Sequence, residues 1–332
     1  MSYNIPISIL ILILIFTQVF LLGKYFCVLQ GIFKDNGCAR FIVGIILYFG
    51  STFIIIFPFI WLKLDVLYYV IIYFTKEFIV FAYLFIRFHS YGINIKYKTI
   101  VSILISSVAI AALYNYGMNS IISLNPYDVE PERFNIINIF VPIIARYSLI
   151  DFHFIVQWIF GCIGGAIIFA SVNALFIELM RKNSVIMQMI SFLVAFGLMF
   201  LLNFGSSLIM MSSLFLLSFG ILLSMKILVY MRRRYAVIMG ILIIVAWTLN
   251  NKLFFVDLSL AIITIFAYTY YRKPKPEIFT VQLIVPVILI ASIGIYPFSI
   301  PAALGLSTVS IIAYILILFS GRIKILRGRL LL

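Results

Sequence analysis

Two charged residues, Lys76 and Glu77, lie next to each other in the middle of an apolar, ring-rich stretch. A charge at the centre of a membrane helix costs about 3 kcal/mol or more and normally faces a protein interior or a wet cavity. Adjacent helical residues point about 100° apart, so we expect each residue to find its partner on another helix or subunit. Three roles stay open: a proton or ion relay, a polar contact to a quinone headgroup, and a structural contact between helices.

Arg146, Asp151 and His153 form a second group of candidates, downstream of the acidic segment 125–133. Arginine and histidine on an outer face would suit an enzyme that acts on a glycan or a lipid-linked sugar, and the same residues would suit a docking surface. The interpretation we favour is an ordinary connector whose arginine side chain reaches the interface.

Metal ligands are not expected in this chain, and a haem bound by one histidine and a methionine stays open without a specific signal in the sequence. The two histidines, His89 and His153, fall on opposite faces, roughly a bilayer thickness apart, so they cannot both bind one haem iron. Cys27, Cys38 and Cys162 have no CxxC spacing and no histidine nearby in the sequence. We therefore predict no metal site, no disulfide and no cofactor, while haem in a partner subunit stays open.

The remaining polar and aromatic signals have simpler explanations. We expect Asp65, Glu178, Lys226 and Asp257 to lie near membrane edges, where long side chains reach water. The rings of the third apolar stretch would suit a pocket for a quinone or porphyrin, but lipid and core contacts explain them better. These rings are Tyr68, Tyr69, Tyr73, Phe74, Phe78, Phe81, Tyr83 and Phe85. Gly161 and Gly165 form a GxxxG pair, which indicates close helix packing.

The composition specifies the environment of these residues. Of 332 residues, 65% are hydrophobic and only 10% are charged, whereas soluble domains average about 45–50% and about 25%. The chain is therefore predicted to be an all-α, multi-pass protein of the cell membrane, embedded in the lipid bilayer. The net charge of +14 fits basic anchors beside anionic headgroups, so no nucleic-acid partner is expected.

Stretches of about 20 apolar residues predict about eleven transmembrane helices in one integral membrane domain, residues 1–332. The short pair 236–250 and 253–271 is the weakest, and its loss would leave nine spans. The predicted spans are 5–22, 41–62, 64–86, 99–123, 152–178, 184–203, 207–231, 236–250, 253–271, 278–297 and 300–320.

The basic residues orient this map with the N-terminus outside and the C-terminus inside. Nineteen of the 24 lysines and arginines then fall in inner segments, as the positive-inside rule requires. Residues 124–151 form an outer loop, in which 135–149 is predicted to be an interfacial or re-entrant helix. Counting 135–149 as a full span would place the later basic clusters outside.

Three functions from different classes fit these features. The first is a non-catalytic subunit of a larger membrane complex, because nearly all of the chain is in helices and no Walker A, GxSxG or HExxH motif is present. The second is an outer-face polysaccharide polymerase or ligase that uses Arg146 and His153. The third is a secondary transporter that uses Lys76 and Glu77.

The Ile-, Tyr- and Phe-rich composition, the few acids and the compact many-span layout resemble one known family. It is the hydrophobic subunit that accompanies archaeal cytochrome b558/566. The resemblance covers the character of the whole chain and identifies no individual site residue. It implies an electron-transfer role beside a haem-bearing partner, which makes the respiratory membrane subunit our first expectation.

Overall fold

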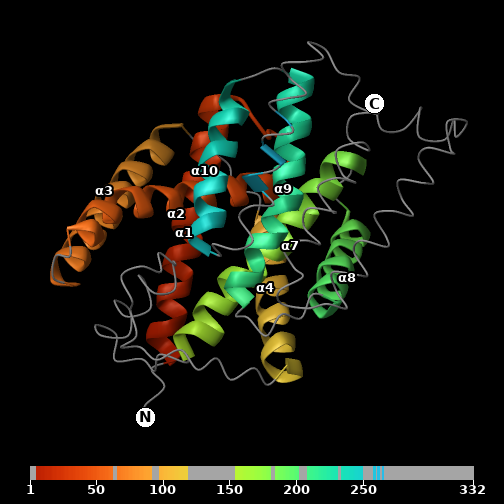
Figure 1. Ribbon diagram of the computed structural model, residues 1–332, viewed down its shortest axis with the longest axis horizontal. Coiled ribbons are helices and arrows are strands. Elements are labelled where there is room, and N and C mark those ends of the chain that lie inside the picture. The colour runs from red at the N-terminus through yellow and green to blue at the C-terminus, as the bar shows by residue number, and fades with distance from the viewer. Residues whose placement is uncertain are drawn as a thin grey trace, which may run out of the picture. The chain divides into compact units, whose positions relative to one another are not determined.

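The computed structural model describes residues 5–62, 66–91, 97–118, 154–180, 184–201, 208–230 and 233–249, together with 257, 258, 260, 261 and 264. Within these ranges the chain forms eight α-helices and one short π-helix, and no strand (Figure 1). The prediction of an all-helical protein is confirmed for this part of the chain.

Each of the first eight predicted spans overlaps one α-helix. The helices are α1 Ile5–Gln30, α2 Gly37–Trp61, α3 Val66–Tyr91, α4 Tyr97–Met118, α7 Phe160–Met180, α8 Val185–Leu201, α9 Leu208–Tyr230 and α10 Arg233–Leu249. The π-helix, Ile155–Ile159, leads directly into α7. The predicted spans 278–297 and 300–320 lie outside the described residues, as does most of 253–271.

Five stretches are long and apolar enough to cross a membrane: 9–30, 37–55, 98–115, 160–180 and 211–230. The apolar parts of α8 and α10 are shorter, and α3, with its Lys76 and Glu77, is not among the five. The membrane character of the chain is therefore confirmed by several helices of sufficient length and hydropathy.

Local polar residues determine where two of the helices begin. The Ala39 amide donates a hydrogen bond to Asn36 Oδ1 (3.0 Å) at the start of α2. The Met187 amide donates a hydrogen bond to Ser184 Oγ (3.3 Å) at the start of α8. Both are N-cap contacts, which satisfy amides that have no partner in the first helical turn.

Helix α1 is longer than predicted, because the apolar pattern continues past residue 22 to Gln30. The next residue, Gly31, has a φ of +63°, the left-handed conformation that commonly ends a helix. Lys24, which the sequence places in an inner loop, instead lies inside α1 and is only 4% exposed.

The chain divides into two compact units, the first comprising residues 1–170 and 206–212. In this unit α1, α2 and α3 contact one another, and α4 contacts α2 (Figure 1). Gly23 of α1 and Gly44 of α2 face each other, so that a methyl group on Gly44 would overlap the Val19 carbonyl oxygen. A methyl group on Gly165 of α7 would lie 2.8 Å from Ser107 O of α4. The close packing predicted for the glycine pair of α7 is thus present at Gly165.

The second unit comprises residues 171–205 and 213–332. Its described residues include the end of α7, all of α8, most of α9 and α10. Lys226 of α9 forms an ion pair with Glu178 of α7, and Ser191 Oγ of α8 donates to Asn173 Oδ1 of α7 (3.1 Å). Glu178 and Lys226, which we predicted to lie near membrane edges, therefore join two helices.

Candidate functional site

Five polar or aromatic residues meet between α2 and α3, and we call them the Lys76 cluster. Tyr48 and Thr52 are four residues apart on α2, and Tyr73, Lys76 and Glu77 have the i, i+3, i+4 spacing on α3. These spacings place each set on one face of its helix. Tyr48, Thr52, Tyr73 and Lys76 are buried, although α3 presents much of its remaining surface outward.

The Lys76 ammonium has partners on both helices. It donates a hydrogen bond to Thr52 Oγ1 and lies 2.7 Å from Glu77 Oε1. It also lies over the Tyr48 ring, 4.5 Å from the ring centroid. A desolvated contact between an ammonium and an aromatic ring contributes about 2 kcal/mol. The side chain is 7% exposed, so these contacts replace the water that Lys76 loses on burial.

The ion pair between Lys76 and Glu77 corrects one prediction from the sequence. We expected neighbours about 100° apart on a helix to be poor partners. Both side chains are long, and their ends meet although their Cβ atoms diverge. The expectation that Lys76 needs a partner on another helix is confirmed by Thr52.

Hydroxyl groups extend the Lys76 cluster along both helices. The Tyr48 and Tyr73 hydroxyls share a hydrogen bond of 2.6 Å, and Thr52 Oγ1 donates to the Tyr48 carbonyl oxygen (2.7 Å). The Glu77 carboxylate interacts electrostatically with both tyrosine side chains. Its Oε1 atom is buried and accepts no hydrogen bond of normal geometry from the described residues. The Glu77 carboxylate therefore neutralises Lys76 through this same Oε1 atom.

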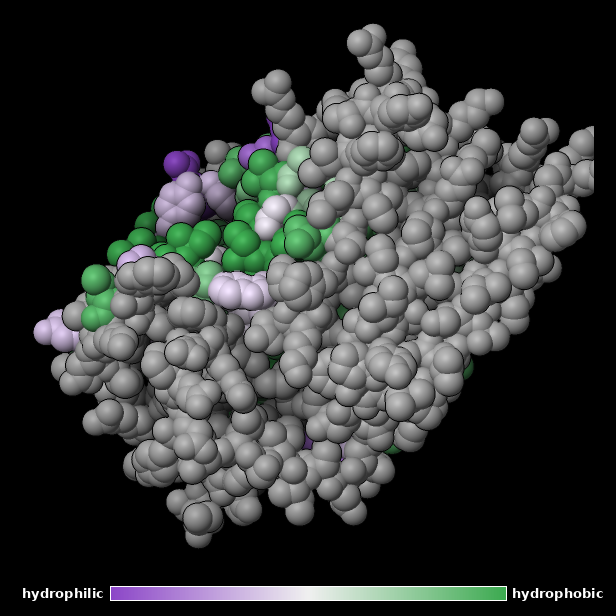
Figure 2. Space-filling model, in the orientation of Figure 1, coloured by the Kyte–Doolittle hydropathy of each residue, from purple (hydrophilic) through white to green (hydrophobic). Residues whose placement is uncertain are grey.

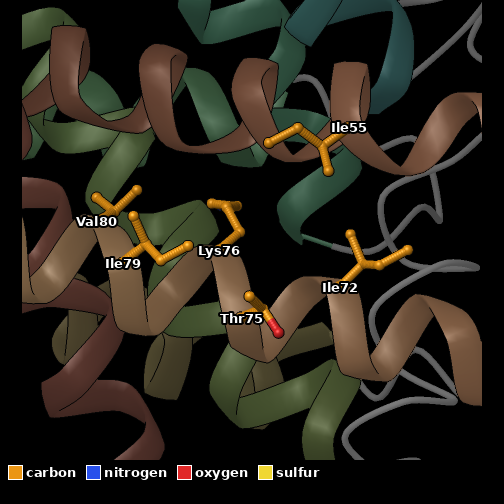
Figure 3. A pocket seen from close by; sticks show the side chains of 6 residues that line it. All are labelled: Ile55, Ile72, Thr75, Lys76, Ile79 and Val80. Carbon is orange, nitrogen blue, oxygen red and sulfur yellow. The ribbon is translucent and has the colours of Figure 1, made fainter.

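An open groove of about 420 Å³ runs beside the Lys76 cluster (Figure 3). Its lining is aliphatic except for Thr75 and Lys76, and Lys76 is its only charged residue. In Figure 3 the Lys76 side chain projects from α3 toward α2. The lining residues are Ile55 of α2 and Ile72, Thr75, Lys76, Ile79 and Val80 of α3.

The rings of α3 do not form a pocket in the described structure. Tyr73 points inward and is 8% exposed, whereas Phe78 is 75% exposed. Figure 2 shows hydrophobic side chains over the described surface on the side where α3 lies. The other outward-facing rings are Tyr68, Phe74, Phe81, Tyr83 and Phe85. Phe74, Phe78, Phe81 and Phe85 share one side of the helix and form an apolar outer face, which we call the α3 face. Tyr83 instead shares a hydrogen bond with Tyr25 of α1 (2.9 Å).

Several other candidates are not located by the structure. Arg146, Asp151 and His153 lie outside the described residues, and so does the predicted interfacial helix 135–149. The described residues contain no group of three or more histidine, cysteine, aspartate or glutamate side chains placed to hold a metal. Cys27, Cys38 and Cys162 are buried free thiols.

The burial of Asp257 was not predicted from the sequence, because we expected this residue to lie near a membrane edge. Asp257 is 1% exposed, and neither carboxylate oxygen has a hydrogen-bond partner among the described residues. The sequence did indicate this burial, because Asp257 lies several residues inside the predicted span 253–271. A short aspartate side chain at that depth cannot reach water as lysine or arginine can.

Searches against protein-family models, curated proteins and solved structures found no match to this chain.

Proposed function

We propose that this chain is a non-catalytic membrane subunit of a respiratory electron-transfer complex that anchors or assists a haem-bearing partner. The observation that supports a non-catalytic role is the Lys76 cluster. Its charges contact one another and hydroxyl groups inside the chain, as a structural link between α2 and α3 would require. The electron-transfer assignment itself is supported by the resemblance to the hydrophobic subunit that accompanies archaeal cytochrome b558/566.

The α3 face supports an assembled subunit. This helix carries exposed phenylalanine rings along one side, whereas Lys76 is buried, which suits a helix packed against lipid and a partner protein. Contiguous apolar surfaces of this kind are typical of membrane or protein interaction sites.

The proposed topology has about eleven transmembrane helices, or nine without the pair 236–250 and 253–271. The N-terminus lies outside and the C-terminus inside, in the cell membrane. The distribution of lysine and arginine over alternate segments supports this orientation.

The test is purification from native membranes in mild detergent, followed by identification of copurifying subunits and a reduced-minus-oxidised absorption spectrum. We expect a haem protein with an α-band to copurify in a fixed ratio. A homogeneous, colourless chain without partners would contradict the proposal.

A secondary transporter is the second candidate, because Lys76 is one of the residues that line the groove beside α3. Proton-coupled uptake by reconstituted vesicles that is lost in Glu77→Gln, but kept in Glu178→Gln, would favour it. The outer-face polysaccharide enzyme remains a prediction that depends on Arg146, Asp151 and His153.

A further inference from the structure

Asp257 lies against the middle of α9, in the second unit. A methyl group built on Gly220 would lie 3.5 Å from Asp257 Oδ1 and 2.9 Å from Leu260 Cδ2. The absence of a side chain at Gly220 therefore lets Asp257 and Leu260 approach the α9 backbone closely. The carboxyl group is enclosed by this packing and has no route to water in the described structure, since the residue is 1% exposed.

The neighbouring hydroxyl groups do not bind this carboxyl. Ser224 Oγ donates to the Gly220 carbonyl oxygen (2.8 Å). Thr264 Oγ1 lies 2.9 Å from Ser224 Oγ and 2.7 Å from the Leu260 carbonyl oxygen. These hydroxyls satisfy one another and the helix backbone, and in the described part of the chain neither oxygen of Asp257 has a hydrogen-bond partner.

No described charged group compensates Asp257. On α9 the nearest candidate in sequence, Lys226, pairs with Glu178 of α7. On α10 the described charged side chain is Arg234, which lies at the exposed start of the helix. An ionised carboxylate in this position would carry the full cost of an unpaired charge in an apolar environment.

We propose that Asp257 is a proton-binding site: its carboxyl group holds a proton while Asp257, Leu260 and Thr264 pack on α9 and releases it when that packing opens. In the packed structure the neutral acid avoids the cost of an unpaired buried charge. Once water or a basic group reaches the carboxyl, ionisation becomes favourable and the proton leaves. The site is distinct from the Lys76 cluster, which belongs to the other unit, and does not depend on the proposed electron-transfer role.

The ligand is assigned as a proton rather than a metal cation for a physical reason. A bound sodium ion needs several oxygen ligands turned toward it, in addition to one carboxylate. Here the hydroxyls of Ser224 and Thr264 are engaged with each other and with backbone carbonyls. A proton needs only one carboxylate oxygen.

The test is infrared difference spectroscopy of the purified full chain, comparing the wild type with Asp257→Asn at neutral pH. We expect the wild type to show the C=O band of a neutral carboxyl group that the variant lacks. The band should shift in deuterated water and disappear as the pH rises, with an increase in carboxylate absorption. Glu178→Gln is the matched control, and should remove a carboxylate band instead because Glu178 is ion-paired.

Three results would overturn the proposal. A carboxylate band for Asp257 at neutral pH would show that the residue is ionised. Conversion of the neutral band to a carboxylate band on replacing choline with sodium would assign a sodium site. A neutral band that persists unchanged until the protein unfolds would show that the proton does not exchange. Asp257→Asn is a neutral isostere of the protonated acid, and its elution profile should match that of the wild type.

Discussion

Among single residues, Lys76 shows how a membrane protein accommodates a deep charge. The ammonium contacts a hydroxyl, a carboxylate and an aromatic ring, so its burial depends on several partners at once. Removing one charged member of such a group leaves its partner buried and unpaired, which is energetically costly. The consequences of substitution are therefore strongly non-additive.

Lys76→Met should destabilise the protein by about 3–5 kcal/mol, because it leaves the Glu77 carboxylate buried without its cation. The double variant Lys76→Met with Glu77→Gln should recover most of that loss, since no unpaired charge remains. Thermal unfolding in detergent measures both, and Lys34→Met, at an exposed position, is the control. Equal destabilisation in the single and double variants would show that the charge pair is not the cause.

Tyr73→Phe should cost about 1–2 kcal/mol, because it removes the partner of the buried Tyr48 hydroxyl. Tyr68→Phe, on the exposed side of the same helix, should leave the stability unchanged. The comparison uses the same unfolding assay. Equal effects of the two substitutions would contradict the inward placement of Tyr73.

Helix packing in the first unit depends on small residues where two backbones meet. Gly23 and Gly44 allow α1 and α2 to touch at their backbones, which favours van der Waals contact between membrane helices. The sequence pattern predicted these helices but not their crossing point, because isolated glycines are common in membrane helices. The GxxxG pair of α7 was easier to recognise, since its spacing is a known packing motif.

Gly44→Ala should destabilise the α1–α2 contact by about 1–3 kcal/mol, because the new methyl group overlaps the Val19 carbonyl oxygen. Gly240→Ala on α10 is the control, since a methyl group there meets no atom within 4 Å. In a helix that change should be neutral or stabilising, by up to about 1 kcal/mol. Thermal unfolding should therefore show a lower stability for Gly44→Ala and an unchanged or higher stability for Gly240→Ala. A neutral Gly44→Ala would show that α1 and α2 do not approach closely at this point.

For the whole molecule, the distribution of basic residues leads to a proposed orientation in the membrane. Positive charge is retained on the inner side, and alternate loops of this chain carry it. The described helices agree with the first eight predicted spans, but helices alone do not specify which end of each faces outward. Orientation therefore needs a measurement on intact cells.

Single cysteines introduced by Glu130→Cys, Lys182→Cys and Lys273→Cys should react differently with a membrane-impermeant maleimide. The first should be labelled in intact cells, and the other two only after the membrane is permeabilised. The native cysteines are buried, so the wild-type chain serves as the background control. The reverse pattern would invert the topology, and labelling of all three sites in intact cells would contradict the span map.

The sequence alone determined the class of this protein and the positions of its first helices. Long apolar stretches must be helical in lipid, because each backbone group has to be satisfied within its own segment. It also singled out Lys76 and Glu77, since charges within an apolar stretch are costly wherever the chain folds. Only the tertiary structure decided how these charges are compensated, because Thr52 and Tyr48 come from another helix. It likewise decided that Asp257 is enclosed and that the rings of α3 face outward, because burial depends on which helix faces pack together.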